Sequence, residues 1–270
     1  MSLIDIVRNF EGLSNFARFE MVCDYLERFD LGFEVQIYSS GRNVIVNSGS
    51  KKEIGVSSHF DAVPGSPGAN DNATAVAVTL DILKRFNNDP LKNIGVRGLF
   101  FDEEEKGLVG SRAYVRAKGT EGLIGVYNME MVGLGDKIAL WSDDLLSEGL
   151  LIKTFECVCK QDMIPCFRFP DIRKILNNSG DHYSFNQAGI KDAFCITTIS
   201  DEDIKVAAKY LSLPNSNLSL ISRQAYSEAP LFSNYHKSSD NAEHLNEKSL
   251  KMVSNLIYNS IRKLDSELKI

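Results

Sequence analysis

Apolar and polar positions along the chain alternate between two periods, and this alternation predicts an α/β fold. Short apolar runs between turn residues are typical of buried strands, whereas apolar residues three or four positions apart are typical of amphipathic helices. Strands are expected over residues 33–38, 43–47, 54–60, 94–101, 124–131 and 191–199. Helices are expected over residues 15–29, 73–86, 110–118, 145–160, 202–211 and 245–264. Because the two kinds of element alternate, we expect a central mixed, mostly parallel β-sheet with helices on both faces.

The chain is expected to form a single domain, because no Pro/Gly/Ser-rich linker divides residues 1–270. One segment, residues 200–234, interrupts the alternation and is too apolar for disorder. It leaves the end of a predicted strand and returns just before His236, so we interpret it as an inserted lid or wall over a pocket. A dimerisation arm, and with it a homo-oligomer, is the alternative. The candidate pocket contacts in this segment are Tyr210, Leu213, Tyr226 and Phe232.

Composition narrows the functional classes. The 30 basic and 36 acidic residues give a net charge of −6, which argues against a nucleic-acid partner. No run of eighteen apolar residues is present, so we expect no membrane-spanning segment. Asp5 falls where a signal peptide would begin its apolar core, so a cytoplasmic protein is expected. The five cysteines are odd in number and lack a C-x-x-C pair, which is typical of reduced, mostly buried thiols.

Imidazoles and carboxylates recur at the ends of the predicted strands, where open α/β sheets bind their ligands. Taken singly, each has a structural explanation. The acidic run 102–105 is typical of a solvated face, and Asn70, Asp71 and Asn72 offer side chains that cap the next helix. Their joint order indicates a metal site instead, because this mixture of ligands suits zinc. The residues concerned are His59, Asp61, Asp71, the acidic run 102–105, Glu130 and His236.

Five ordered motifs resemble those of the di-zinc (co-catalytic) metallopeptidases of the bacterial leucine aminopeptidase type. That superfamily also contains glutamate carboxypeptidases and glutaminyl cyclases. The chain departs from the family pattern at three positions: Gly180 replaces Ser, Lys237 replaces Thr, and Glu130 replaces the usual Asp with a ligand one methylene longer. The matching segments are His59-Phe60-Asp61 for H-x-D, 67–73 for P-G-A-x-D-N-A, 104–111 for E-E-x-G-L-x-G-S, Asp181-His182 for S-D-H, and 236–240 for H-T-x-x-D.

The resemblance implies a role for each matched residue. Asp71 would bridge two Zn²⁺ ions per chain, with His59 and Glu130 completing one site and Glu105 and His236 the other. It further implies a cis peptide bond after Asp71. Among the three consecutive glutamates, the spacing to Gly107 selects Glu104 as the general base and leaves Glu103 without a role. In the remaining implied roles, Asp61 accepts a hydrogen bond from the far ring nitrogen of His59, and Asp181, His182 and Tyr183 lie beside the substrate.

The activity implied by the resemblance is that of a zinc metalloaminopeptidase, which hydrolyses N-terminal residues from peptides. A carboxypeptidase on the same scaffold is one alternative, since Arg168 and Arg173 are available to bind a terminal carboxylate. A glutaminyl-cyclase-like enzyme is another, although it works with a single zinc. A non-catalytic binding protein on a peptidase scaffold is the alternative from a different functional class.

Overall fold

Eight strands of the described residues form one mixed sheet. The computed structural model describes residues 2–141, 148–169, 180–213 and 217–268. The sheet order is β1-β2-β4-β3-β5-β8-β6-β7, and the four central strands β4, β3, β5 and β8 run parallel. Antiparallel pairing joins β1 to β2, β2 to β4, and β6 to β8. The strands are β1 Glu34–Ile37, β2 Arg42–Val46, β3 Glu53–His59, β4 Gly95–Phe101, β5 Leu123–Met129, β6 Lys137–Trp141, β7 Cys166–Arg168 and β8 Ala193–Ile199.

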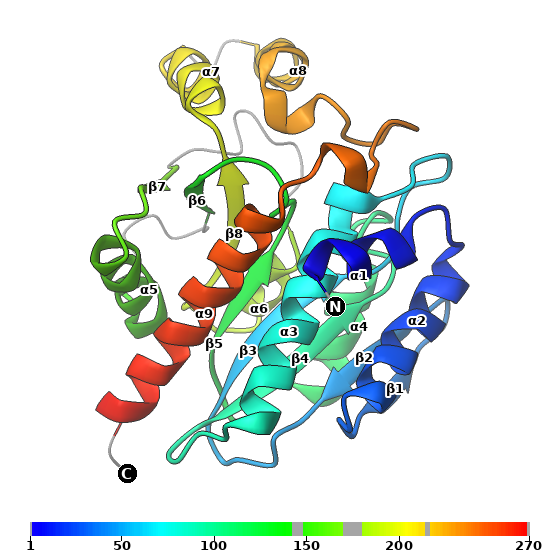
Figure 1. Ribbon diagram of the computed structural model, residues 1–270, viewed down its shortest axis with the longest axis vertical. Helices are drawn as coiled ribbons and strands as arrows, with labels where there is room; N and C mark the ends of the chain where they lie inside the picture. Colours follow the sequence, from blue (N-terminus) through cyan, green and yellow to red (C-terminus); the bar gives the residue numbers. More distant parts are fainter. Residues whose placement is uncertain (1, 142–147, 170–179, 214–216, 269–270) are drawn as a thin grey trace.

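Helices cover both faces of the sheet, as predicted. In Figure 1, α1, α3 and α9 lie in front of the sheet, whereas α4 and α6 lie behind it. The short helical turns are η1 Ala69–Ala73, η3 Pro230–Phe232 and η4 Ala242–His244. The longer helices are α1 Leu3–Phe10, α2 Asn15–Arg28, α3 Thr74–Asn88, α4 Val109–Lys118, α5 Leu150–Gln161, α6 His182–Gln187, α7 Asp201–Leu211, α8 Leu218–Glu228 and α9 Glu247–Glu267.

Strand β3 lies in the middle of the sheet and is buried along its whole length. Its apolar side chains are Ile54 and Val56, and the polar residues Ser57, Ser58 and His59 that follow them are buried as well. The core on one face includes Val56, Leu80 and Ile257, contributed by β3, α3 and α9. The core on the other face includes Tyr114 and Phe185 from α4 and α6. The carboxyl end of β3 is therefore held between these two cores.

The predicted elements are all present, with ends shifted by a few residues. The predicted helix 145–160 begins at Leu150 among the described residues, and residues 145–147 lie outside them. Apart from the short helical turns, five elements in the described part of the chain were not predicted: α1, β6, β7, α6 and α8. Most are short, such as the three residues of β7, so little periodicity marks them. Helix α1 has only eight residues, and a capping box between Ser2 and Asp5 stabilises its first turn.

The segment 200–234 forms α7, α8 and η3 beyond the carboxyl end of β8 (Figure 1). Its apolar side chains share a core with Trp141 of β6 and Ile199 of β8. Asp203 closes a capping box with Ser200 and also accepts a hydrogen bond from the Leu231 backbone N–H at 2.9 Å. The segment is therefore fastened to the same end of the sheet at which the predicted ligands lie.

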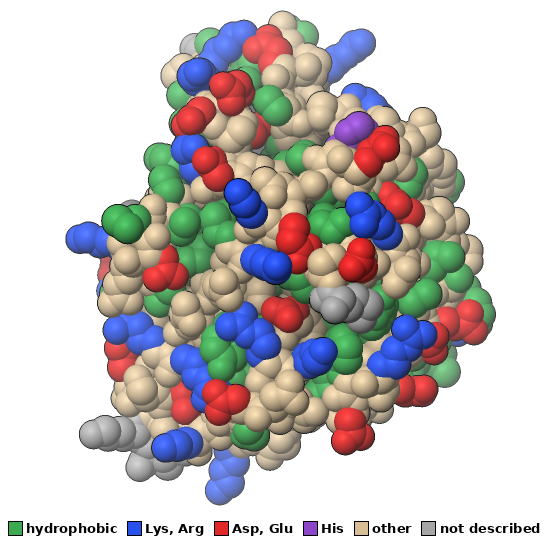
Figure 2. All heavy atoms as spheres, viewed as in Figure 1, with side chains coloured by type: hydrophobic (Ala, Val, Ile, Leu, Met, Phe, Trp, Pro, Cys, Tyr) green, Lys and Arg blue, Asp and Glu red, His purple; other side chains and the backbone are tan. Residues whose placement is uncertain are grey.

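The surface of the protein carries charged side chains of both signs. On the face shown in Figure 2, acidic and basic side chains are interspersed. Within the described ranges, none of the helices has both the length and the apolar character needed to cross a bilayer. The cysteines are free thiols: Cys159 and Cys195 are buried, Cys23 and Cys166 are half-buried, and Cys157 is exposed.

Candidate metal centre

The five predicted ligands meet at the carboxyl ends of the central strands. His59 is the last residue of β3, and Asp71 lies in η1. Glu105 follows β4, Glu130 follows β5, and His236 follows η3. Their ligand atoms form two groups of three, each within 4.8 Å, and Asp71 belongs to both. The two groups are His59, Asp71 and Glu130, and Asp71, Glu105 and His236.

The distances make Asp71 the centre of the cluster. Its Oδ1 atom lies 3.3 Å from His59 Nε2, and its Oδ2 atom lies 3.3 Å from His236 Nε2. His59 Nε2 is also 3.2 Å from Glu130 Oε2, and His236 Nε2 is 3.0 Å from Glu105 Oε2. Each oxygen of one carboxylate therefore faces a separate imidazole, which is the arrangement of a bridging ligand.

The donor set fits two divalent cations. Asp71, Glu104, Glu105 and Glu130 bring four carboxylates together, and two divalent cations would balance their charge. Glu105 Oε1 is buried and has no hydrogen-bond partner among the described residues, although buried carboxylate oxygens are normally satisfied. With three protein groups on each metal, the arrangement also leaves the open position that a catalytic zinc needs.

The proton equilibria of the cluster reflect this crowding. Burial lowers the pKa of His236, but its hydrogen bonds to Asp71 and Glu105 outweigh burial and raise the pKa to about 9. Burial likewise opposes the hydrogen bonds from both imidazoles to Asp71, which nevertheless hold its pKa below the usual value. Burial raises the pKa of Glu104 well above its usual value, and the nearby charge of Glu130 adds to the effect. Repulsion between buried carboxylates destabilises the folded protein, and bound cations would relieve this repulsion.

The turn that carries Asp71 is held from two sides. Asp240 accepts hydrogen bonds from the backbone N–H groups of Asn70 and Asp71, at 2.9 and 3.1 Å. The Asp71–Asn72 peptide bond is cis, as the resemblance implied. The capping role expected of Asn70 and Asn72 is wrong. Their side-chain amides bind the segment after β5 instead: Asn70 Oδ1 accepts from Gly133 N, and Asn72 Nδ2 donates to Glu130 Oε2 at 2.7 Å.

Arg18 supports the same turn from α2 and was missed by the sequence analysis. Its side chain is fully buried, and its guanidinium donates to the carbonyl oxygens of Phe60, Pro67 and Gly68. Burial lowers its pKa to about 10, while the charges of Asp61 and Asp71 oppose this shift. The guanidinium therefore fixes the loop between His59 and Asp71. The position of Arg18 among the apolar residues of the predicted helix 15–29 was the feature of the sequence that indicated a buried role.

Asp61 and Glu104 both lie beside His59. Asp61 Oδ1 is 3.3 Å from His59 Nδ1, the nitrogen that faces away from Asp71. The same carboxylate accepts hydrogen bonds from the backbone N–H groups of Glu104 and Glu105, at 3.1 and 3.2 Å. Glu104 Oε2 lies 4.0 Å from His59 Nε2. Glu103 turns away from the cluster and binds Lys106 at 2.7 Å and Ser40 at 2.5 Å.

The three residues expected beside the substrate lie behind the cluster rather than in its pocket. Asp181 is fully buried, and burial together with the charge of Glu130 raises its pKa to about 7. His182 is also buried, and Tyr183 is half-buried. Gly180, immediately before them, does line the pocket.

A pocket of about 40 Å³ opens over the cluster. His59, Asp71, Glu104 and Glu130 form its polar side. Of the four contacts expected from segment 200–234, Tyr226 and Phe232 line the pocket, whereas Leu213 is exposed and Tyr210 packs in the core below α8. The tyrosine ring of Tyr226 stacks on Phe232 at 4.2 Å. Pocket residues that the sequence analysis did not single out are Met131, Trp141 and Tyr235.

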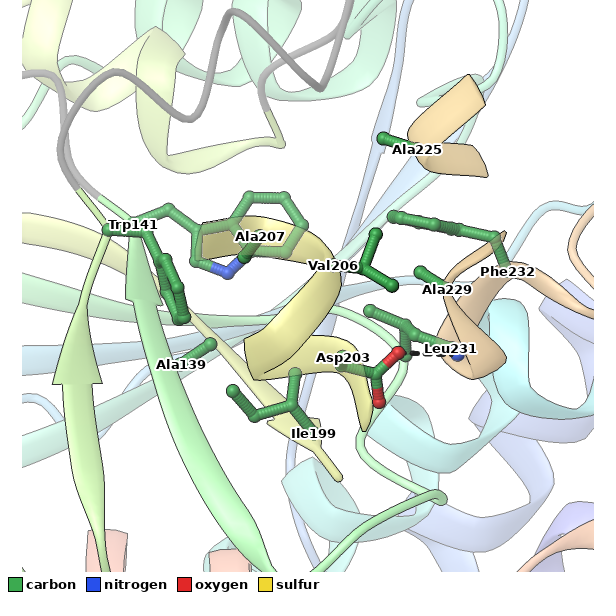
Figure 3. A pocket seen from close by; sticks show the side chains of 11 residues that line it. Ala139, Trp141, Ile199, Asp203, Val206, Ala207, Ala225, Ala229, Leu231 and Phe232 are labelled. Carbon is green, nitrogen blue, oxygen red and sulfur yellow. Dashed lines mark hydrogen bonds between the residues drawn. The ribbon is translucent and has the colours of Figure 1, made fainter. Parts of the chain in front are cut away.

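A second, apolar pocket of about 50 Å³ adjoins the first (Figure 3). Trp141 and Phe232 line both pockets, so these two rings separate them. Val206 and Ala207 of α7 and Ala225 of α8 line the apolar pocket from the segment 200–234.

Comparison with known protein families gives a match over the part of the chain that contains the candidate ligands. The model of peptidase family M28 matches residues 43–261, which include every candidate ligand. The chain belongs to peptidase family M28. M28 is a metallopeptidase family, and the His/Asp/Glu cluster is the candidate metal site of this chain.

Individual relatives refine this picture. This M28 chain is 27% identical over 179 residues to aminopeptidase YwaD of Bacillus subtilis, which covers 64% of the chain and 38% of the relative. Its fold is similar to that of a zinc aminopeptidase from Bacillus subtilis, with a TM-score of 0.63, 21% identity, and coverage of 83% and 50% of the two chains. It is also similar to Porphyromonas gingivalis glutaminyl cyclase, with a TM-score of 0.69, 13% identity, and coverage of 97% and 94%. The chain thus spans half or less of these aminopeptidases.

Proposed function

We propose that this M28 protein is a metal-dependent aminopeptidase that binds two Zn²⁺ ions and hydrolyses N-terminal residues from peptides. The observation that carries the proposal is the position of Asp71. Its two oxygens face His59 and His236 separately, in two overlapping ligand groups beside the pocket that Glu104 lines. A binding protein that had lost catalysis would have no need for the complete set.

In this proposal, His59, Asp71 and Glu130 hold one metal ion, and Asp71, Glu105 and His236 hold the other. When bound, the two ions acidify water and polarise the carbonyl of the scissile peptide bond. The Glu104 carboxylate accepts a proton from the attacking water and delivers it to the leaving amine nitrogen. Asp61 fixes the ring orientation of His59 and the backbone of Glu104, which keeps the base aligned.

Tyr235 adds a hydroxyl donor to the same pocket. Its ring stacks on His236 with 3.7 Å between the ring centroids. Burial raises the pKa of the phenol, and the charge of Asp71 adds to this effect, so the hydroxyl stays protonated at neutral pH. We assign it the role of donating a hydrogen bond to the carbonyl oxygen as negative charge develops there.

The charge of the pocket favours an N-terminal substrate over a C-terminal one. Free α-amines are cations, and the carboxylates of the cluster attract them. A carboxypeptidase needs a cation placed for a terminal carboxylate. Arg168 pairs with Glu156 at 2.5 and 2.6 Å, and Arg173 lies outside the described residues. Among the described residues that line the pocket, none is Lys or Arg.

The apolar side of the pocket supports a preference for an apolar N-terminal side chain. Met131, Trp141 and Phe232 offer it a dry surface, and the segment 200–234 supplies part of that wall. In this proposal the segment acts as a substrate-selecting wall, and the lining of the pocket by Tyr226 and Phe232 supports that role.

A panel of chromogenic aminoacyl substrates tests the proposal, with N-blocked peptides and N-terminal glutaminyl peptides as controls. Zinc-loaded protein should cleave leucyl, methionyl or phenylalanyl substrates and leave N-blocked peptides intact. Cleavage of blocked peptides at a free C-terminus would support the carboxypeptidase instead. Conversion of glutaminyl peptides to pyroglutamyl peptides, without hydrolysis, would support the cyclase.

A further inference from the structure

Two departures from the family motifs, fifty positions apart, meet in space. Gly180 replaces the motif serine, and Glu130 replaces the motif aspartate. A Cβ atom built on Gly180 would lie 3.0 Å from Glu130 Oε1 and 3.3 Å from Glu130 Cγ. It would also lie 2.9 Å from Asn128 Nδ2. The space beside the longer glutamate is therefore the space that a side chain at position 180 would fill.

Backbone conformation does not explain the glycine. Other glycines of the chain, such as Gly68 with φ of +63°, adopt left-handed backbone that side chains disfavour. The φ of Gly180 lies outside that region. What Gly180 provides is room.

The neighbours of Gly180 cannot easily move away. Glu130 Oε2 accepts a hydrogen bond from Asn72 Nδ2 at 2.7 Å, and Glu130 Oε1 accepts one from Asn128 Nδ2 at 3.2 Å. Asn128 is itself fixed, because its Oδ1 accepts a hydrogen bond from Ser57 Oγ at 2.7 Å. Glu130 and Asn128 are both buried. An added methyl group would thus meet atoms that are held on their other sides, and tight interiors transmit such shifts.

We propose that Gly180 is a positioning residue that makes room for the longer side chain of Glu130, so that the two residues form a matched pair. With Gly180, the extra methylene is accommodated and Glu130 Oε2 reaches 3.2 Å from His59 Nε2. A side chain at 180 would push the carboxylate out of this position, whereas the shorter Glu130→Asp side chain would leave a gap there. This inference rests on the proposed metal site for its effect on zinc, and on packing alone for its effect on stability.

Only one of the two metal groups touches this pair. Glu130 belongs to the group with His59 and Asp71, whereas Glu105 and His236 complete the other group. Gly180→Ser should therefore weaken one zinc equivalent and leave the second nearly unchanged. Changes behind a metal ligand typically cost about 10–100-fold in affinity, and we expect a loss in this range for the affected equivalent.

A double-mutant cycle tests the pairing, with wild type, Gly180→Ser, Glu130→Asp and the double variant. Zinc affinity is measured by titration against a competing chelator, and thermal unfolding is measured on the chelated proteins. Each single variant should lose affinity for one equivalent and unfold at a lower temperature. The double variant should recover most of both losses, because contacting residues couple in such cycles. Gly180→Ala, which adds the Cβ atom without a hydroxyl, should repeat the loss.

Gly32→Ser is the matched control, because an added Cβ atom there meets nothing within 4 Å. It should change neither readout. Additive losses in the cycle, or a Gly180→Ser variant with wild-type zinc affinity and stability, would overturn the pairing. If wild type binds two zinc ions and shows the coupling but hydrolyses no peptide, the proposed function fails and the pairing stands. If wild type binds no zinc, the proposed function fails, and the melting temperatures of the four metal-free proteins decide the pairing: additive losses overturn it.

Discussion

The carboxylate of Asp61 contacts both the ligand His59 and the backbone that carries Glu104 and Glu105. It is buried, and it accepts hydrogen bonds from the backbone N–H groups of Glu104 and Glu105 while facing His59 Nδ1. The Asp61→Asn variant keeps the shape of this side chain but converts one oxygen into an amide donor. An amide cannot accept from both backbone N–H groups at the oxygens they now use, so one of them loses its partner.

The size of the effect follows from these contacts. Losing a hydrogen bond to a charged group costs about 1.5–3 kcal/mol, so the metal-free variant should be less stable by that amount. The effect on His59 should be smaller, because its Nδ1 also lies 3.1 Å from the carbonyl oxygen of Asp61, which the substitution keeps. Zinc affinity should therefore fall by about 10-fold, at the lower end of the range for residues behind metal ligands.

Urea unfolding of the chelated protein and zinc titration against a competing chelator measure the two effects. Asp136→Asn is a matched control, since the carboxylate of Asp136 is 80% exposed and pairs with Lys137 at the surface. Exposed pairs of this kind contribute about 0–1 kcal/mol, so the control should remain close to wild type. Wild-type stability and zinc affinity in Asp61→Asn would refute the assigned role.

Four further outcomes are expected. Glu104→Gln should keep its zinc and lose about 10²–10⁴-fold in kcat. The control Glu103→Gln should retain most turnover, because the Glu103 side chain faces Lys106 and Ser40. Equal rates in the two variants would show that Glu104 is not the general base. Tyr235→Phe should keep zinc and lose about 10²–10³-fold in kcat, the usual cost of removing one oxyanion donor, and an unchanged kcat would exclude that role. Arg18→Lys should lower the free energy of unfolding by about 1–3 kcal/mol for each carbonyl left without a donor, which a melting curve would detect. Chelation should lower the melting temperature, because a ligand at 100 times its Kd stabilises the folded state by about 2.7 kcal/mol; identical melts with and without zinc would argue against a metal site.

Much of the fold was predictable because it depends on buried strands. Strands such as β8, whose residues are all buried, give nearly continuous runs of apolar and β-branched residues, and long helices such as α9 give a strong 3.6-residue period. Strand β7 and helix α6 are too short to give either pattern. They form because neighbours cover them: Cys166 of β7 pairs with Ile138 of β6, and Phe185 of α6 packs against Tyr114.

The site residues that lie in sequence motifs were predictable, whereas the contacts made by tertiary packing were not. His59, Asp71 and His236 lie in motifs, so their convergence followed from the resemblance. Asn72 was predicted as a helix cap because Asn, Asp and Asn precede a helix, yet its amide binds Glu130 across the site. Tertiary hydrogen bonds of this kind leave no local periodicity. Arg18 illustrates the same limit, since its three carbonyl partners lie more than forty residues away.

Zinc-dependent hydrolysis, measured as metal is returned to the chelated protein in known amounts, tests the central claim most directly. The five ligands around Asp71 predict that hydrolysis of a leucyl substrate rises until two zinc equivalents per chain are bound and then stays constant. Elemental analysis of the saturated protein should then give two zinc ions per chain. Hydrolysis that reaches its maximum at one equivalent, or that proceeds without any metal, would contradict the account.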